Sequence, residues 1–252
     1  MLELQCGEIK LFQNLKLLDG QVLKSENAYI ASVMQNGKVI GNSEGETDIV
    51  IEENHEIVNR FHCKVTCGKS SLPLLLNRFN KVPAPCGELV LLEPHLVPEN
   101  NEILLEQYTA SAFSQMVQAA KKENIWLIAN FGYRSNEQQA QIIDHFTSLE
   151  GKEKAMQRCA PVGFSEHHSG LSLDVGGGIY KENQQLAAAR TVWSWIAENC
   201  HKYGFALKNL PGKEKITGTI YEPWHIRYLG DLELCAQLHE KQLTLDEYLD
   251  QI

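Results

Sequence analysis

The apolar positions of the first 70 residues form short β-prone runs rather than helical repeats. The stretch YIASVMQNGKVIG contains two such runs on either side of Asn36-Gly37, a dipeptide that strongly favours a tight hairpin turn. TDIVIEE, which follows, has the composition of another strand. We therefore predict a small β-rich N-terminal module over residues 1–70, to which the sequence assigns no role.

From residue 71 onward, segments with helical spacing alternate with isolated strands. Phe113 and Met116 recur at helical intervals with their apolar neighbours, and Ser135 has the side chain of an N-cap for the helix that follows it. We expect strands in LPLLLNRFNKVPAP, 126–131 and YEPWHIRYLG, and helices over 105–123, NEQQAQIIDHF, 184–202 and, with Thr244 as its cap, TLDEYLDQI. Paired helices between isolated strands favour an α+β fold, with a small mixed or antiparallel sheet flanked by helices over residues 71–252.

The stretch SEHHSGLSLD, residues 165–174, is the first that points to chemistry. We expect a hairpin or tight bend at its glycine, and then a strand whose apolar residues alternate with Ser172 and Asp174. An isolated ionised carboxylate is too costly to bury, so Asp174 must be paired, hydrogen-bonded or bound to a metal. His167 can approach it across the bend. One imidazole and one carboxylate suit zinc, which needs a third protein ligand in a catalytic site.

A candidate third ligand lies about fifty residues downstream, in YEPWHIRYLG. His225 follows Glu222 by three residues, and Pro223 disfavours a regular helix, so a bent segment can aim both side chains into one cleft. His225 then completes the metal site. Glu222 is left to act as a general base, which takes a proton from a metal-bound water whose pKa the metal lowers to about 7, and passes it to the leaving amine.

Together these segments resemble the paired signatures of the zinc D-alanyl-D-alanine peptidases, S-x-H-x-x-G-x-A-x-D and E-x-W-H-x-R-Y. That family includes the VanY-type carboxypeptidases and the VanX-type and VanXY-type dipeptidases of vancomycin resistance. A third family element, a G-Y-R-S turn before a helix, is present as GYRSNEQQ at 132–139, and LPLLLNRFNKVPAP resembles the usual opening strand of the domain. ITGTIYEPWHIRYLG and LTLDEYLDQ are similar to the cytoplasmic VanXY type. The resemblance covers residues 72–252 and leaves the first 70 residues unmatched.

The resemblance implies the role of each motif residue. His167, Asp174 and His225 match the ligands of a Zn²⁺ ion, and Glu222 matches the catalytic base. The implied fold is that of a zinc D,D-peptidase domain over residues 71–252.

Three further positions match the part of the family's site that binds the peptide. Arg134 matches the arginine that holds the substrate or the developing oxyanion, a role that suits its planar fork of donors, although a structural salt bridge at a helix start is the alternative. Ser165 and Gln139 match positions that line the peptide cleft. Ser172 replaces the commoner alanine, a small-for-small change that leaves Asp174 in place.

Several residues near these motifs have simpler explanations. His168 points away from His167 in extended structure, so we expect it to line the cleft or to face solvent. Trp224 and Tyr228 are expected in the core. His62, Cys63 and Cys67 lack the second pair of ligands that a metal clip needs, so packing is the favoured explanation for them. The other histidines are expected to be surface or core residues: His55, His62, His95, His145, His201 and His239.

Composition limits the partners and the setting. The chain of 252 residues carries a formal net charge of −9 and has no cluster of lysine and arginine, which argues against a nucleic-acid partner. No stretch has the roughly 18 apolar residues of a membrane span. The seven cysteines are an odd number without a disulfide framework, and the first residues do not resemble a secretory signal, so we expect a cytoplasmic location. The oligomeric state stays open.

These observations favour a zinc metallopeptidase that hydrolyses D-Ala-D-Ala, as the free dipeptide or at the end of a peptidoglycan precursor. An L,D-carboxypeptidase that trims tetrapeptide stems is the alternative within enzymes, because the same zinc centre serves both reactions and only the shape of the pocket separates them. A zinc-containing protein that binds peptide without turnover is the alternative from another class. It is less favoured because Glu222 and all three presumed ligands are present.

Overall fold

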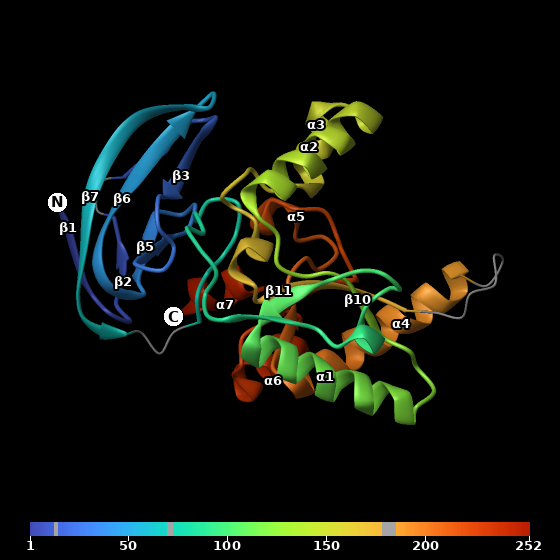
Figure 1. The fold of residues 1–252 in the computed structure, drawn as a ribbon. Helices are drawn as coiled ribbons and strands as arrows, with labels where there is room; N and C mark the ends of the chain where they lie inside the picture. Colours follow the sequence, from blue (N-terminus) through green and yellow to red (C-terminus); the bar gives the residue numbers. More distant parts are fainter. Residues whose placement is uncertain (13–14, 70–72, 178–184) are drawn as a thin grey trace.

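The chain folds into an N-terminal part made of β-strands and a larger part in which helices surround a small sheet (Figure 1). The computed structural model describes residues 1–12, 15–69, 73–177 and 185–252, and it describes only the backbone at 67–69 and 185–190. The predicted α+β class is confirmed, and every pairing in the larger part is antiparallel. None of the described helices is long and apolar enough to span a membrane.

Two sheets form the N-terminal part. One has the strand order β1 (Leu2–Gln5), β7 (Glu56–Lys69), β6 (Ser43–Glu53), β3 (Gln21–Ser25), and the other has the order β2 (Ile9–Leu11), β5 (Lys38–Gly41), β4 (Ala31–Val33). The predicted hairpin at Asn36-Gly37 is confirmed, since β4 and β5 pair across it and Gly37 adopts a φ of +90°.

The N-terminal sheets enclose a core of their own, which includes Leu23, Ile49 and Cys63. His62 lies on the opposite side of β7, where it pairs with Glu46 and Asp48. Among the side chains that the structure describes, this region therefore forms no metal clip. The side chain of Cys67 lies outside the described residues.

The larger part is built on a four-stranded sheet. Its strand order is β10 (Ile128–Phe131), β11 (Ser172–Gly176), β13 (His225–Tyr228), β12 (Phe205–Leu207), and a separate hairpin joins β8 (Leu89–Leu91) to β9 (Leu104–Glu106). The α-helices are α1 (Gln107–Lys122), α2 (Asn136–Glu150), α3 (Lys152–Arg158), α4 (Gln185–Asn199), α5 (Glu214–Thr217), α6 (Leu232–Lys241) and α7 (Leu245–Gln251), and the 3-10 helices are η1 (Pro94–Leu96), η2 (Glu166–Ser169) and η3 (Cys200–Tyr203). As predicted, Ser135 and Thr244 cap α2 and α7, each through a capping box.

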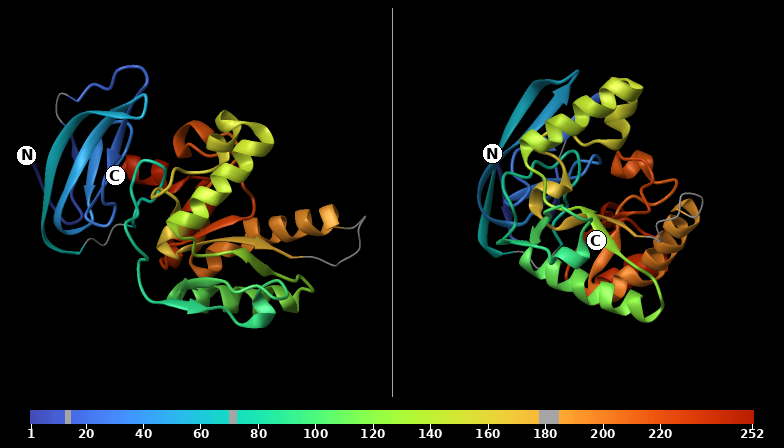
Figure 2. Two further views of the ribbon diagram at one scale, coloured as in Figure 1. Left: turned by 45° about the horizontal axis from the view of Figure 1, so that its top comes forward. Right: turned by 45° about the vertical axis from the view of Figure 1, so that its right-hand side comes forward.

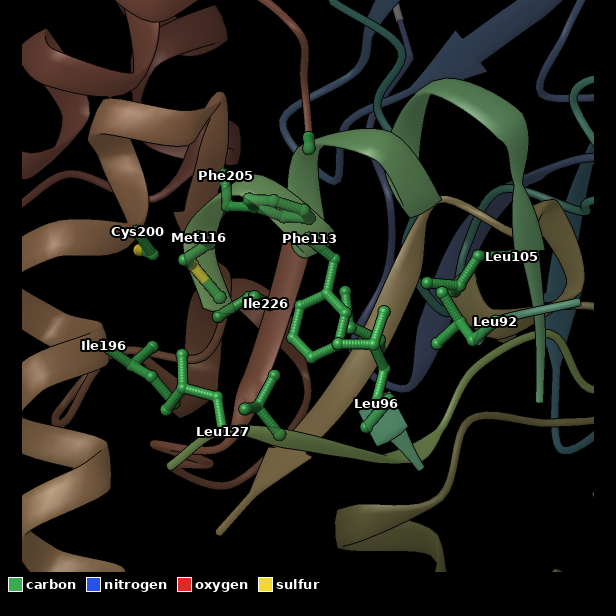
Figure 3. Close-up of a cluster of buried hydrophobic side chains, with 14 of the residues drawn as sticks. Leu92, Leu96, Leu105, Phe113, Met116, Leu127, Ile196, Cys200, Phe205 and Ile226 are labelled. Atoms are coloured by element: carbon green, nitrogen blue, oxygen red, sulfur yellow. The ribbon is translucent and has the colours of Figure 1, made fainter. Parts of the chain in front are cut away.

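The two faces of this sheet have opposite characters. One face packs on α1 and α4, where Phe113 and Met116 meet Ile226 and Ile196 in a continuous apolar core (Figure 3). The other face is turned toward α2 and α3, which stand on the far side of the sheet (Figures 1 and 2). Because side chains alternate along a strand, each strand that contributes to the core also presents side chains to the α2 side.

Two of the expected strands are wrong in part. The described residues of LPLLLNRFNKVPAP, 73–85, form no strand and make only one isolated bridge, from Asn80 to Ser25. Three prolines in that segment remove backbone donors, and scattered backbone hydrogen bonds, such as the one from Lys81 N to Ser25 O, together with side-chain hydrogen bonds take the place of a strand ladder. The strand expected over 126–131 begins at Ile128 and is an edge strand, and Trp126, which precedes it, and Phe131 at its end are exposed.

Asn80 connects this segment to the N-terminal part. Its side chain is fully buried, accepts a hydrogen bond from Val33 N (2.7 Å) and donates one to Val33 O (3.0 Å), as a neighbouring strand would. At the other end of the chain, Asp250 of α7 accepts hydrogen bonds from Asn36 and Lys38. The N-terminal part is therefore joined to the larger part by both buried and surface contacts.

We expect Asn80→Ala to lower the free energy of unfolding by about 3 kcal/mol, because it leaves the N–H and C=O of Val33 buried without partners. Urea denaturation followed by circular dichroism measures this loss. Asn101→Ala, at an exposed loop position, is the matched control and should stay within about 0.5 kcal/mol of wild type. Equal stability of the two variants would show that the amide of Asn80 does not hold the two parts together.

Candidate metal centre and active site

The segment 165–174 is a tight bend rather than a hairpin. Ser165 caps η2 by accepting a hydrogen bond from His167 N, and η2 ends at Gly170, whose φ is +76°. A Cβ at that glycine would lie 2.7 Å from Leu89 and 3.1 Å from the backbone of Glu106, so both its φ and the close contacts disfavour a larger residue. The chain then enters β11, which places His167 and Asp174 near each other.

Strand pairing brings the third side chain to them. Asp174 of β11 and His225 of β13 are directly opposite in the antiparallel register, on the face away from the core. The Oδ1 atom of Asp174 lies 3.0 Å from His225 Nδ1 and 3.6 Å from His167 Nε2. Among the described residues, these three form the one cluster of histidine, cysteine and acidic side chains whose ligand atoms could share a metal ion, all within 4.8 Å.

The surroundings of His167 suit it to be a metal ligand. His167 Nδ1 faces Gly132 O at 2.7 Å, so that nitrogen donates its hydrogen and Nε2 keeps its lone pair toward Asp174. Burial, together with the charge of Arg134, lowers the pKa of His167 and keeps it neutral. Two imidazole nitrogens and one carboxylate oxygen are a ligand set typical of catalytic zinc, so these residues fit that metal.

Glu222 reaches the same cleft through a turn. His225 N donates to Glu222 O (3.2 Å), which closes the Glu-Pro-Trp-His segment just before β13 begins. Burial raises the pKa of Glu222 above its ordinary value, while the charge of His225 opposes this shift. Asn209 Nδ2 donates to Glu222 Oε2 (2.8 Å), which anchors one carboxylate oxygen and leaves the other available.

The backbone of Arg134 is held beside the three candidate metal ligands by hydrogen bonds with His167 and His168. Its N–H donates to His167 O, and its C=O accepts from His168 Nδ1 (2.7 Å). The guanidinium donates to Gln139 Oε1 (2.8 Å) and lies 4.0 Å from Asp174. Burial lowers the pKa of Arg134, yet an arginine stays charged at neutral pH.

A cavity of about 370 Å³ joins these groups into one cleft. Glu222, Arg134 and the three residues of the metal cluster all line it. Other walls come from α2, from the segment between α3 and η2, from polar residues that include Lys208 and Asn209, and from the aromatic side chains of Phe131, Phe146, Phe164 and Trp224. The residues singled out in the sequence are therefore brought together at one place.

The structure corrects two expectations for neighbouring residues. His168 neither lines the cleft nor faces solvent, because it is buried and its Nε2 accepts a hydrogen bond from Gly163 N. Trp224 is not a core residue but a half-buried wall of the cleft. Gln139 lines the cleft, where its amide oxygen accepts from Arg134 and its NH2 group donates to Ala160 O.

Sequence reasoning missed two side chains that contact the site, Glu166 and Asn209. Glu166 could have been noticed, because it is a charged residue inside SEHHSGLSLD, a motif expected to be largely buried, and a buried carboxylate needs partners. The cations of Lys208 and Arg227, with His225, outweigh the effect of burial and hold the pKa of Glu166 well below its ordinary value. Asn209 lies outside every motif, so no pattern in the sequence marked it.

Comparison with known families agrees with this geometry. The VanY family of D-alanyl-D-alanine carboxypeptidases matches residues 102–231, just over half of the chain. The chain therefore belongs to the VanY family.

Individual relatives point the same way. The chain is 39% identical over 152 residues to a D-alanyl-D-alanine carboxypeptidase of Enterococcus faecium, a match that covers 60% of this chain and 46% of that protein. The matched region thus spans about half the length of that relative.

Two solved structures are similar to the chain. The LD-carboxypeptidase LdcB is 32% identical with a TM-score of 0.61, over 71% of this chain and 85% of that one. A mutant of the vancomycin resistance D,D-pentapeptidase VanY, in complex with Zn(II), is 30% identical with a TM-score of 0.60, over 70% and 97%. One fold therefore accommodates proteins named for D,D and for LD activity.

In the metal-free protein we expect His225 to stay positively charged beyond pH 8. Burial alone would lower its pKa, but hydrogen bonds with Asp174 and Glu166 outweigh burial and raise the pKa to about 10. The imidazole ¹⁵N chemical shifts of the metal-free protein, followed from pH 6 to 10.5, measure this. Asp174→Asn should move the transition to lower pH, and a wild-type His225 that titrates near 6.5 would contradict the hydrogen-bonding scheme.

Proposed function

We propose that this chain is a zinc peptidase that hydrolyses the D-Ala-D-Ala bond, in the free dipeptide or at the end of a peptidoglycan precursor. The observation that carries the proposal is the meeting of three metal-ligand side chains, one glutamate and one arginine around a single cleft. The similarity to a Zn(II) complex of VanY supports zinc as the metal. Metal-assisted hydrolysis of a C-terminal peptide bond has a use for each of these groups.

His167, Asp174 and His225 would hold the ion. Bound there, zinc would polarise the scissile carbonyl and make a water molecule acidic near neutral pH. The ligands come from a 3-10 turn and two adjacent strands of one sheet, so their spacing is held by backbone pairing rather than by mobile loops.

Arg134 would bind the substrate. Its guanidinium has five N–H donors, and Gln139 accepts from one nitrogen, which aims the planar fork and leaves other donors for a carboxylate or a developing oxyanion. Ser165 lines the same wall, although its hydroxyl also caps η2. A carboxypeptidase requires such a cation because its substrates end in a free carboxylate.

Glu222 would move the proton. A carboxylate whose pKa is raised by burial is better matched to proton transfer at neutral pH than one in water. Glu222 takes a proton from the attacking water and delivers it to the amide nitrogen as the carbon–nitrogen bond breaks, so the products are a carboxylic acid and a free amine. The bond from Asn209 keeps the carboxylate in the cleft during this transfer.

The second candidate is an L,D-carboxypeptidase, favoured by the similarity to LdcB. The cleft groups described above would serve this reaction unchanged, because the scissile amide is chemically similar and only the neighbouring stereocentre differs.

Glu222→Gln should lower kcat at least about a hundredfold while the protein still binds one zinc ion, because the substitution removes the base but no ligand. His225→Ala should instead lose the metal. Release of D-alanine and zinc content, measured on the same preparations, separate the two effects. A Glu222→Gln protein that retains full turnover would remove Glu222 from the mechanism, and a wild type that binds zinc without turnover would favour a peptide-binding protein.

A panel of substrates distinguishes the two enzymatic candidates. We expect release of D-alanine from D-Ala-D-Ala or from a pentapeptide that ends in it, and at least tenfold lower kcat/KM for a tetrapeptide whose last bond joins an L-centre to D-alanine. The opposite order would assign the L,D activity. Glu222→Gln, run in parallel, is the control for hydrolysis by a contaminant.

A further inference from the structure

Glu166 is a fully enclosed carboxylate whose two oxygens have different partners. Oε2 lies 3.0 Å from His225 Nε2 and also accepts a weaker hydrogen bond from Ser172 Oγ (3.4 Å). Oε1 accepts from Arg227 Nη1 (2.9 Å) and lies 3.3 Å from Lys208 Nζ. The side chain is only 6% exposed, so protein groups make up nearly all of its surroundings.

This arrangement decides which nitrogen of His225 can bind a metal. A carboxylate that faces two cations is ionised and can only accept hydrogen bonds, so His225 Nε2 must carry a hydrogen and donate it to Glu166. A metal that binds the ring displaces the second ring proton, the one on the side of Asp174, so that the lone pair is then on Nδ1. Nδ1 is the nitrogen that lies beside Asp174, on the side of the metal cluster.

We propose that Glu166 is a positioning residue of the metal site, which holds the ring of His225 so that Nδ1 faces the ion. The proposal rests on the metal site of the proposed function and adds a residue to it. Gly132 O plays the corresponding part for His167 and leaves the opposite nitrogen, Nε2, free. The two histidines would thus ligate through different nitrogens, and each would be fixed by its own partner behind the ring.

A purely structural role for Glu166 is the competing explanation, since it also neutralises Arg227 and Lys208. The two roles can be tested separately, because Oε2 of Glu166 contacts His225 while Oε1 contacts the two cations. Of the two oxygens of Glu166, Lys208 contacts only Oε1, and its other bond is to Leu76 O, so Lys208→Met weakens the ion-pair network without touching the bond to His225. Glu166→Gln removes the charge and changes the bond to His225 at nearly constant volume.

In Glu166→Gln the amide has one oxygen and one NH2 group. The oxygen must face the cations, so the NH2 group turns toward His225 Nε2, which becomes an acceptor and moves the ring hydrogen to Nδ1. We expect zinc affinity to fall tenfold to a hundredfold, measured by competition with a chromogenic chelator. For Lys208→Met we expect less than about a threefold change. Circular dichroism of each metal-free variant reports folding separately.

A second measurement needs no variant. In the zinc-loaded wild-type protein, imidazole ¹⁵N shifts should show His225 protonated on Nε2 and metal-bound on Nδ1, with the reverse pattern for His167. Metal binding through His225 Nε2, or equal zinc affinities for Glu166→Gln and Lys208→Met, would overturn the positioning role alone. A wild-type protein that binds no zinc would overturn the proposed function and this inference with it.

Discussion

A buried negative charge behind His225 is the interaction on which the larger part of the molecule depends. Glu166 is ionised inside the protein, and such a charge is tolerated only when cations and hydrogen bonds surround it. Arg227 comes from the same strand as His225, and Lys208 comes from the end of β12. Both also donate to backbone carbonyls of residues 74–76, the segment that enters the larger part. One carboxylate therefore ties together two strands, the bend at residues 165–170 and the connection to the N-terminal part.

The same strands supply the core and the chemistry. In β13, Ile226 packs into the apolar core while His225 and Arg227, its neighbours on either side, point to the polar face. A register shift of one residue would bury the charged side chains in the core and expose Ile226. The hydrophobic core thus enforces the register, and the register in turn sets Asp174 opposite His225. The alternation of side chains between the two faces of β13 therefore supports both the stability of the core and the arrangement of the candidate metal ligands.

The sequence predicted what local patterns encode. Alternation in SEHHSGLSLD and the turn chemistry of Glu-Pro-Trp-His proposed the three metal ligands and Glu222, and the resemblance to the zinc peptidases added Arg134, Ser165 and Gln139. The capping residues were also foreseen. Residues whose importance depends on distant contacts were not. Asn209 matters only because the chain returns next to Glu222, and His168 is buried because Gly163 and Arg134 close over it. Side-chain bonding in the segment after residue 73 likewise depends on a partner from the N-terminal part.

The motif residues and the cleft walls have different proposed roles, the first in catalysis and the second in substrate selection. The proposed hydrolysis uses the candidate metal ligands, the glutamate and the arginine, which lie on η2, on β11 and β13, in the turn before β13 and just before α2. Selection between an L and a D centre beside the scissile bond is expected to depend instead on the shape of the cleft, to which Phe131, Phe146, Phe164 and Trp224 contribute walls. The two similar structures, one named for LD activity and the other for D,D activity, are 32% and 30% identical to the chain, with TM-scores of 0.61 and 0.60. Specificity in this fold is therefore expected to change through the walls, without any change to the metal site.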